Sequence, residues 1–216
     1  MRFDRKVVMI TGAAGNLGRA VAKAFADLGA TVAPIERKDA DLRDAQSVQQ
    51  AVDRLLAQHG RIDVLCNVAG AFRMGPALHE TPDADWEFLF EVNAKSVLHT
   101  SRAVVPAMLR QGGGKIVNVA AYAAQKGSAG MGAYVASKSA VIRITETMAA
   151  ELREKHINVN CVLPTVIDTP ENRAAMPKAD PRRWVAPQDL AAVIVFLASD
   201  AARAVHGAAL PVSGLS

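Results

Sequence analysis

The sequence predicts an α/β fold: a doubly wound parallel sheet covered by helices on both faces. Two observations favour this class. Short runs of Val, Ile and Leu alternate along the chain with longer segments whose apolar residues recur at helical spacing. These short runs are apolar almost without interruption, which is typical of parallel strands buried on both faces. Because no repeat, low-complexity tract or linker interrupts the pattern, we expect residues 1–216 to form one domain.

The elements follow in order along the chain. The strands are expected at 6–10, 31–35, 62–66, 115–119, 157–164 and 208–212, and Asp41-Leu42 has the pattern of a short additional strand after the second. The helices are expected at 17–28, 47–58, 83–110, 132–155 and 187–199. Gly29 and Gly60 end the first two helices.

Composition excludes several classes of protein. The net charge is +4 with a pI near 9.3, but Lys and Arg are scattered among acids without interleaved aromatic residues, so we expect no nucleic-acid partner. No apolar run is long enough for a membrane span, and the start lacks the pattern of a signal peptide, so the expected location is the cytoplasm. Cys66, Cys161 and five isolated histidines give no metal-ligand spacing, so no metal is expected.

A glycine-rich turn, TGAAGNLG (11–18), follows the first strand and opens the first helix. Gly12 permits the tight turn, Gly15 (or Ala14) lets the backbone approach a pyrophosphate, and Gly18 lets the helix pack on the sheet. The free N–H groups at the start of that helix, including Asn16 and Leu17, suit anionic phosphates. A plain strand–helix turn is the alternative, but the position predicts a dinucleotide site.

Three further positions extend this predicted site. Glu36 ends the second strand, where a carboxylate accepts hydrogen bonds from ribose hydroxyls and repels a 2′-phosphate, which favours NAD over NADP. Arg37 and Lys38 keep NADP possible, since they are able to bind a 2′-phosphate. Asp41 of the Asp41-Leu42 pair has two interpretations: its carboxylate faces the adenine amino group, or it is an acid in a turn. NVAG (67–70) supplies the small residues Asn67, Ala69 and Gly70, against which a flat ring or ribose fits.

Tyr134 and Lys138 form the candidate reacting pair. They are separated by four residues on an expected helix, so their side chains share one face. The phenol has an ordinary pKa near 10, and a neighbouring ammonium stabilises the phenolate and lowers that pKa. Such pairs are also common on solvent faces. Next to a dinucleotide site, the pair predicts a general acid or base.

With these motifs in order, the chain resembles the short-chain dehydrogenase/reductase family over nearly its whole length. The resemblance rests on the glycine turn, Asp41-Leu42, NVAG, Asn93, the Tyr134–Lys138 pair and the final strand. It implies a seven-stranded Rossmann sheet of order 3-2-1-4-5-6-7 and hydride transfer from nicotinamide. It further implies that Tyr134 donates the proton, that Lys138 binds the nicotinamide ribose, and that Asn93 holds a water linked to Lys138. Pro164 and Thr169 follow the sixth strand of that pattern, where Thr169 contacts the carboxamide.

Three residues depart from that family pattern. Asn16 replaces the middle glycine, Thr165 follows Pro164 where glycine is usual, and Ala121 stands where the family usually has a serine. Loss of a neutral hydroxyl contact costs about 0.5–1.5 kcal/mol, roughly tenfold in rate, whereas loss of a true oxyanion donor costs about 10²–10³-fold. Activity on an ordinary ketone should therefore fall without vanishing.

The segment 163–184 is similar to the corresponding part of dihydropteridine reductase, which also has alanine at the serine position and prefers NADH. The shared residues are Leu163-Pro164, Asp168-Thr169-Pro170, Asn172-Arg173, Met176-Pro177, Ala179-Asp180 and Trp184. We expect residues 163–186 to form a substrate loop or lid, with Met176 and Trp184 placed to cover a ring. A surface loop is the alternative.

These inferences leave three hypotheses about function. The first is an NAD-dependent reductase acting on a flat, electrophilic ring such as a quinonoid dihydropterin. The second is an alcohol dehydrogenase or carbonyl reductase, and the third is a nucleotide-binding regulator without turnover, suggested only by Ala121. Apolar residues on several sides of the helices at 96–110 and 132–155 predict a homodimer or homotetramer.

Overall fold

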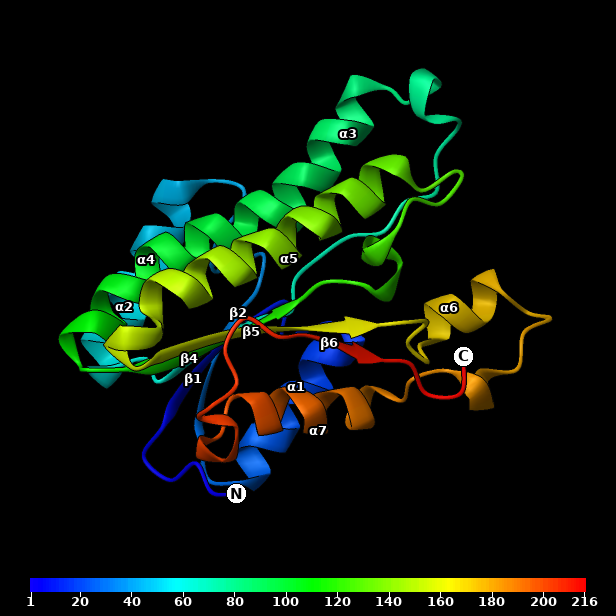
Figure 1. The fold of residues 1–216 in the computed structure, drawn as a ribbon. Helices are drawn as coiled ribbons and strands as arrows, with labels where there is room; N and C mark the ends of the chain where they lie inside the picture. The colour runs from blue at the N-terminus through cyan, green and yellow to red at the C-terminus, as the bar shows by residue number, and fades with distance from the viewer.

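The computed structural model describes all residues from Met1 to Ser216. One sheet of six parallel strands has the order β2-β1-β3-β4-β5-β6 (Figure 1). The strands are β1 (Val7–Thr11), β2 (Thr31–Ile35), β3 (Val64–Asn67), β4 (Gly114–Val119), β5 (Ile157–Pro164) and β6 (Ala209–Val212). The strand order reverses between β1 and β3, and in sheets of this kind a ligand crevice forms outside the carboxyl ends at that point. The predicted doubly wound α/β class is confirmed.

Helices cover both faces of the sheet. In Figure 1, α1 (Asn16–Asp27) and α7 (Pro187–Leu197) lie below it, whereas α2 (Ala45–His59), α4 (Ser96–Arg110) and α5 (Gly132–Leu152) lie above. Strand β1 is buried under helices on both faces of the sheet, which explains its unbroken apolar run. Val8 and Ile10 pack into the core with Phe25 of α1, whereas Met9 packs into the core on the other face. Burying each such side chain stabilises the fold by about 1.5–3 kcal/mol.

The seventh strand predicted at Asp41-Leu42 is absent. Asp44 caps the start of α2, since its carboxylate accepts hydrogen bonds from Gln46 N and Ser47 N at 3.0 and 3.2 Å. Only residues 36–43 therefore remain between β2 and that cap. A crossover that adds a parallel strand takes at least about 10–12 residues, so this connection forms a turn instead. As a result β2 is an edge strand, and it contains Pro34.

The helix predicted at 83–110 consists of three pieces. They are α3 (Asp83–Phe90), a π-helical turn η2 (Glu91–Lys95) and α4. A π turn inserts one extra residue into a helix and often accompanies a functional position. Here it contains Asn93, whose side chain is buried.

The segment 163–186 projects beyond the carboxyl end of β5 and contains α6 (Pro170–Ala175) and the 3-10 turn η5 (Pro181–Arg183) (Figure 1). Its two ends are tied together: Val185 N donates to Val166 O at 2.9 Å, and Asp168 N donates to Val185 O at 2.8 Å. The C-terminal residues hold it from the other side, where Leu215 N donates to Arg183 O at 2.9 Å. The rest of the segment is therefore a closed loop on a fixed base. No helix in the chain combines the length and the apolarity that a membrane crossing demands.

Candidate functional site

The glycine turn lies at the carboxyl end of β1 and leaves no room for side chains. Gly12 has φ +69°, and a Cβ there would lie 2.9 Å from Ala69 Cα. A Cβ on Gly18 would overlap the Gly12 carbonyl oxygen and lie 2.7 Å from Ala13 Cα. Gly15 precedes α1 and provides no side-chain cap, so the first-turn N–H groups of this helix are available to an anion.

Asn16 links this turn to the 163–186 segment. Its Nδ2 donates to Glu171 Oε2 at 2.7 Å, and its Oδ1 accepts from Arg19 at 2.6 Å. The residue that departs from the family's glycine pattern thus joins α1 to the first turn of α6. Hydrogen bonds from its own backbone amide and from the Thr169 hydroxyl, followed by that from Asn16, hold the pKa of Glu171 below its usual range.

At the end of β2, the carboxylate of Glu36 is about one-third exposed, and Lys38 Nζ lies 3.4 Å from it. Asp41 is exposed and forms an ion pair of 2.8 Å with Arg43, whose hydrogen bond lowers the pKa of Asp41 to about 2. The Leu42 carbonyl oxygen lies 3.0 Å from His99 Nδ1. Glu36 therefore stands at the strand end as expected, whereas the Asp41 carboxylate is committed to a local turn.

The NVAG segment is fixed against β1 at the end of β3. The Thr11 hydroxyl accepts from Val68 N at 3.2 Å and Ala69 N at 3.3 Å. The side chain of Asn67 is directed into the core, where it donates to Asn118 Oδ1 at 2.9 Å and accepts from Thr100 at 2.8 Å. Only the backbone and small side chains of this segment therefore face the crevice.

Gly70 lies where the remaining site residues converge. A Cβ on this residue would lie 3.0 Å from both Asn93 Oδ1 and Lys138 Nζ. The Asn93 amide is held by Ala71, accepting from its N at 2.8 Å and donating to its O at 3.0 Å, and it also donates to Ser137 Oγ at 3.0 Å. The π turn thereby brings Asn93 beside the lysine.

Lys138 is buried, with 5% of its surface exposed, and burial lowers its pKa to about 8. Its ammonium donates to Val119 O at 2.8 Å, at the end of β4. Burial raises the pKa of Tyr134 to about 12, so this phenol is protonated at neutral pH and the lowering expected from the Lys138 ammonium is not found. The ring of Phe72 meets that of Tyr134 edge to face, with centroids 4.9 Å apart.

The other expected positions lie on neighbouring elements. Ala121 is buried two residues after β4, and Pro164 ends β5. Thr169 caps α6, its hydroxyl accepting from Asn172 N at 3.2 Å. Met176 and Trp184 lie on the 163–186 segment, where Met176 ends α6 and Trp184 follows η5.

Sequence reasoning missed Phe72 and Met74. The aromatic neighbour of Tyr134 is Phe72, which is 55% exposed, and Met74 close by in the chain is 64% exposed. Aromatic residues make up only 5% of the chain, so an aromatic directly after NVAGA was the available signal. Both residues offer apolar surface on the open side of the site.

Comparisons with known proteins agree with this geometry. A family model described as Enoyl-(Acyl carrier protein) reductase matches residues 36–214. Dehydrogenase/reductase SDR family member 6 of Rattus norvegicus is 31% identical, over 99% of this chain and 98% of that protein. The chain belongs to the short-chain dehydrogenase/reductase family. It is therefore an oxidoreductase of a family whose members use NAD(P).

Other short-chain dehydrogenases and reductases are similar over the same extent. D-threitol dehydrogenase of Mycolicibacterium smegmatis is 35% identical, over 99% of this chain and 93% of that protein. Its alignment runs over 243 positions against 216 residues here, so the relative carries additional segments. Among solved structures, NAD+-bound xylitol dehydrogenase is 27% identical with a TM-score of 0.91, covering 99% of this chain and all of that chain.

Proposed function

We propose that this protein is an NAD(H)-dependent reductase that transfers a hydride to a flat, electrophilic substrate. The observation that carries the proposal is the convergence of Lys138 and Asn93 next to Gly70, with Tyr134 one helical turn from Lys138, at the same end of the sheet as the glycine turn. Steady-state oxidation of NADH with a panel of quinonoid dihydropterins, quinones and simple ketones tests it. Absence of NADH oxidation with every substrate would instead support the third hypothesis, a regulator without turnover.

The residues present fit a dinucleotide. Gly12 and Gly18 let the turn, NVAG and α1 pack closely, which leaves the uncapped N–H groups of α1 facing the crevice, and Gly70 places no side chain against Lys138. In this proposal the backbone of Gly15, Asn16, Leu17 and Gly18 binds the pyrophosphate. Glu36 binds the adenosine ribose. Leu42 and the backbone of Asp41 lie beside the adenine, since the Asp41 carboxylate is paired with Arg43. Asn67, Ala69, Gly70, Pro164 and Thr169 form the wall around the nicotinamide end.

When bound, the dihydronicotinamide supplies the hydride. Tyr134 supplies the proton. Burial keeps its phenol protonated before the reaction, but the raised pKa also makes it a weaker acid. The phenolate left behind is stabilised by the Lys138 ammonium, which lies one helical turn away. The carbonyl of Val119 and the buried surroundings hold that ammonium in place.

Two features support a flat, electrophilic substrate. Ala121 has no hydroxyl with which to polarise a carbonyl, so a substrate that is already electron-poor is the better match. Phe72 exposes apolar surface next to Tyr134, Met74 exposes more two residues further along the chain, and such surface suits the face of a ring. Met176 and Trp184 are placed in the 163–186 segment, which we propose acts as a lid on the same ring and excludes water.

Ala121→Ser is expected to raise kcat/KM for simple ketones by about tenfold or more, since it adds a hydroxyl donor near the reacting carbonyl. On an electrophilic ring the same change is expected to have little effect. The measurement is steady-state kinetics on both substrate classes. Ala121→Cys is the matched control, because a thiol of similar size is a weak donor. An equal gain on both classes would contradict the proposed substrate class.

The second candidate, a sugar-alcohol dehydrogenase, is favoured by the similarity to D-threitol dehydrogenase. This candidate would oxidise its substrate instead of reducing it, and its substrate would be a polar polyol instead of a flat ring. Oxidation of polyols with NAD+ at a rate above the reduction of any ring substrate would select it. Both candidates keep Tyr134 and Lys138 in the same roles.

We further propose that NADH is preferred over NADPH. The Glu36 carboxylate accepts ribose hydrogen bonds, and Lys38 is already held 3.4 Å from it. Glu36→Gln is expected to weaken NADH binding and strengthen NADPH binding, shifting the ratio of dissociation constants by about tenfold or more. Fluorescence titration measures both constants. Asp27→Asn, an exposed acid on α1 paired with Lys23, is the charge control. A ratio that shifted equally in this control would contradict the role of Glu36.

A homodimer or homotetramer assembled through α4 and α5 completes the proposal. Leu98 and Leu109 of α4 are 44% and 43% exposed, and such apolar surface is commonly covered in an oligomer. Light scattering at micromolar concentration is expected to give a mass of two or four chains, and a monomer would contradict it. The two buried free thiols, Cys66 and Cys161, support a reducing compartment such as the cytoplasm.

A further inference from the structure

A second cavity lies at the opposite end of the sheet from the glycine turn. It has a volume of about 490 Å³ and 19 lining residues, of which only three are hydrophobic. Lys6 immediately precedes β1, Asp63 precedes β3, and Lys115 and Asn158 lie at the starts of β4 and β5. The cavity therefore opens at the amino ends of the strands, whereas the coenzyme crevice is at their carboxyl ends. Its volume is within the range of small-molecule sites.

Positive charge dominates the lining of this cavity. Its cationic residues are Arg2, Lys6, Arg61, Lys115, Arg153 and Arg203, and its only carboxylates are Asp63 and Asp200. These cations come from segments far apart in the sequence, and the fold brings them to one concave surface. Such a concentration of cations in a mostly polar cavity favours an anionic ligand.

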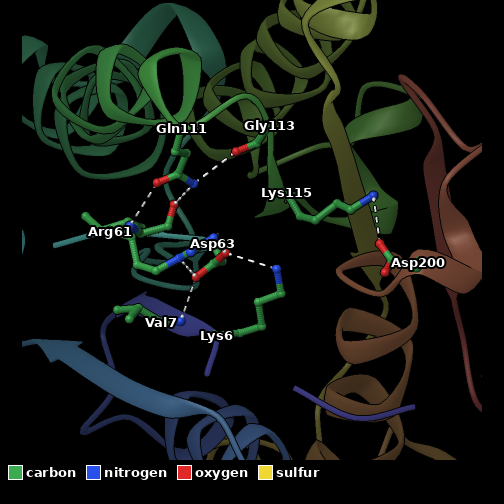
Figure 2. Close-up of polar contacts among 9 residues, drawn as sticks. Lys6, Val7, Arg61, Asp63, Gln111, Gly113, Lys115 and Asp200 are labelled. Atoms are coloured by element: carbon green, nitrogen blue, oxygen red, sulfur yellow. Dashed lines mark hydrogen bonds and ion pairs between the residues drawn. The ribbon is translucent and has the colours of Figure 1, made fainter. Parts of the chain in front are cut away.

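Asp63 does not offset this charge, because two cations share it. Figure 2 shows Lys6 and Arg61 both directed at its carboxylate, with ion-pair distances of 3.2 and 2.6 Å, while Val7 N donates to it at 2.9 Å. The Asp63 side chain is only 6% exposed. Burial alone would raise its pKa, but the bonds from Arg61, Val7 and Lys6 outweigh burial and keep it ionised. One positive charge remains in excess.

Arg2 is paired with Asp4 at 2.7 Å, and the other three cations have weak partners or none. Lys115 Nζ donates to the neutral Asn158 Oδ1 at 2.8 Å. Its nearest carboxylate is that of Asp200 at 3.8 Å (Figure 2), and this side chain is 96% exposed to solvent. The lining residues Arg153 and Arg203 form no ion pair at all, and both are exposed. His206, which also lines the cavity, has a buried Nδ1 without a hydrogen-bond partner.

We propose that this cavity binds a compact polyanion carrying two or more phosphate groups. Arginine guanidinium groups bind phosphate through paired N–H donors, and Arg153 and Arg203 have theirs free. The one aromatic residue of the lining other than histidine, Phe3, is 4% exposed and belongs to the core, so nothing here stacks on a base. Recognition therefore falls on the phosphate chain, whether it is free or part of a nucleotide.

Two consequences distinguish this site from the proposed coenzyme crevice. A ligand here lies at the opposite end of the strands from the coenzyme crevice, and each strand residue adds about 3.3 Å to their separation. It therefore does not compete with NADH. Because the lining is assembled only in the folded chain, the ligand also stabilises the fold and raises its melting temperature.

The test is calorimetric titration of the whole protein with tripolyphosphate at physiological salt, together with thermal unfolding. The double variant Arg153→Gln/Arg203→Gln is expected to bind at least about tenfold more weakly and to lose the increase in Tm. The control double variant Lys23→Gln/Arg143→Gln removes the same charge from exposed positions of α1 and α5 and is expected to bind like the parent. NADH affinity is expected to be equal in all three proteins, with or without tripolyphosphate.

Further arms identify the source of the phosphates. ATP is expected to bind at this site with the same dependence on Arg153 and Arg203, and adenosine is not expected to bind there. If the control variant bound tripolyphosphate as weakly as Arg153→Gln/Arg203→Gln, the loss of affinity would reflect general surface charge. That result would overturn the proposal. Displacement of tripolyphosphate by NADH would assign it to the coenzyme crevice and also overturn it. So would binding confined to RNA or to anionic vesicles, with no affinity for tripolyphosphate.

Discussion

Tyr134→Phe is expected to lower kcat by about 10²–10⁴-fold while leaving the dissociation constant for NADH within about twofold of the parent value. The variant removes only the hydroxyl that we propose donates the proton. It keeps the ring, and with it the edge-to-face contact with Phe72 at 4.9 Å. Steady-state kinetics gives kcat, and quenching of protein fluorescence gives the NADH affinity.

The chain has only one other tyrosine, and it provides the control. Tyr122 lies in the 3-10 turn η3 (Tyr122–Gln125), close to the site in sequence, and is 45% exposed. Tyr122→Phe is expected to retain full turnover. If both variants kept parental kcat, Tyr134 would not be the proton donor, even though the family assignment would stand.

Gly18→Ala is expected to abolish NADH binding and lower stability, whereas Gly15→Ala is expected to leave stability nearly unchanged. A methyl on Gly18 overlaps the carbonyl oxygen of Gly12 and lies 2.7 Å from Ala13 Cα, so α1 or the turn must move. Overpacking of this kind costs about 1–3 kcal/mol, and each kcal/mol lowers Tm by about 2–4 °C in a chain of this size. NADH titration and thermal unfolding measure the two effects.

Gly15 is a suitable control for stability because it lies in the same turn and has a backbone conformation that other residues adopt. Its φ is −70°, and an added Cβ would lie 3.3 Å from its nearest neighbour, the Gly12 oxygen. Parental NADH affinity in Gly18→Ala would show that the helix need not approach the turn closely. If Gly15→Ala lost as much NADH affinity as Gly18→Ala, the glycines would be needed for contact with the pyrophosphate and not only for packing of the helix.

The parts of the fold that were predictable from the sequence are those whose causes are local. Val8, Met9 and Ile10 form an uninterrupted apolar run because successive side chains enter the cores on opposite faces of the sheet. Similarly, Gly12 is needed where the chain has φ +69° directly after a strand. Neither inference depends on a distant residue.

The features that sequence reasoning missed depend on contacts between distant segments. Asn16 and Glu171 are separated by 155 residues, and only the fold places their side chains 2.7 Å apart. The basic cavity was missed for the same reason, since Lys6, Arg61 and Arg203 appear in the sequence as scattered surface charges. The seventh strand failed differently: Asp41-Leu42 has an acceptable pattern, but the chain leaves too few residues to build the crossover.

For the candidate site, the sequence indicates residue types but not their surroundings. The sequence placed Tyr134 and Lys138 on one helix, but their surroundings are set by tertiary packing. Burial raises the pKa of the phenol to about 12 and lowers that of the ammonium to about 8. No pattern of residues along the chain reports those environments.

The loss of the outer strand leaves β2 with an unpaired backbone along one side, and Pro34 limits what can add there. Thr31 N donates to Lys6 O, and Ile35 O accepts from Gly12 N, so these two residues direct their backbone groups toward β1. The alternate residues Val32 and Pro34 therefore direct theirs outward. Proline has no N–H to offer to an incoming strand. The exposed edge is therefore a poor template for a second molecule, which protects the shortened sheet from edge-to-edge aggregation.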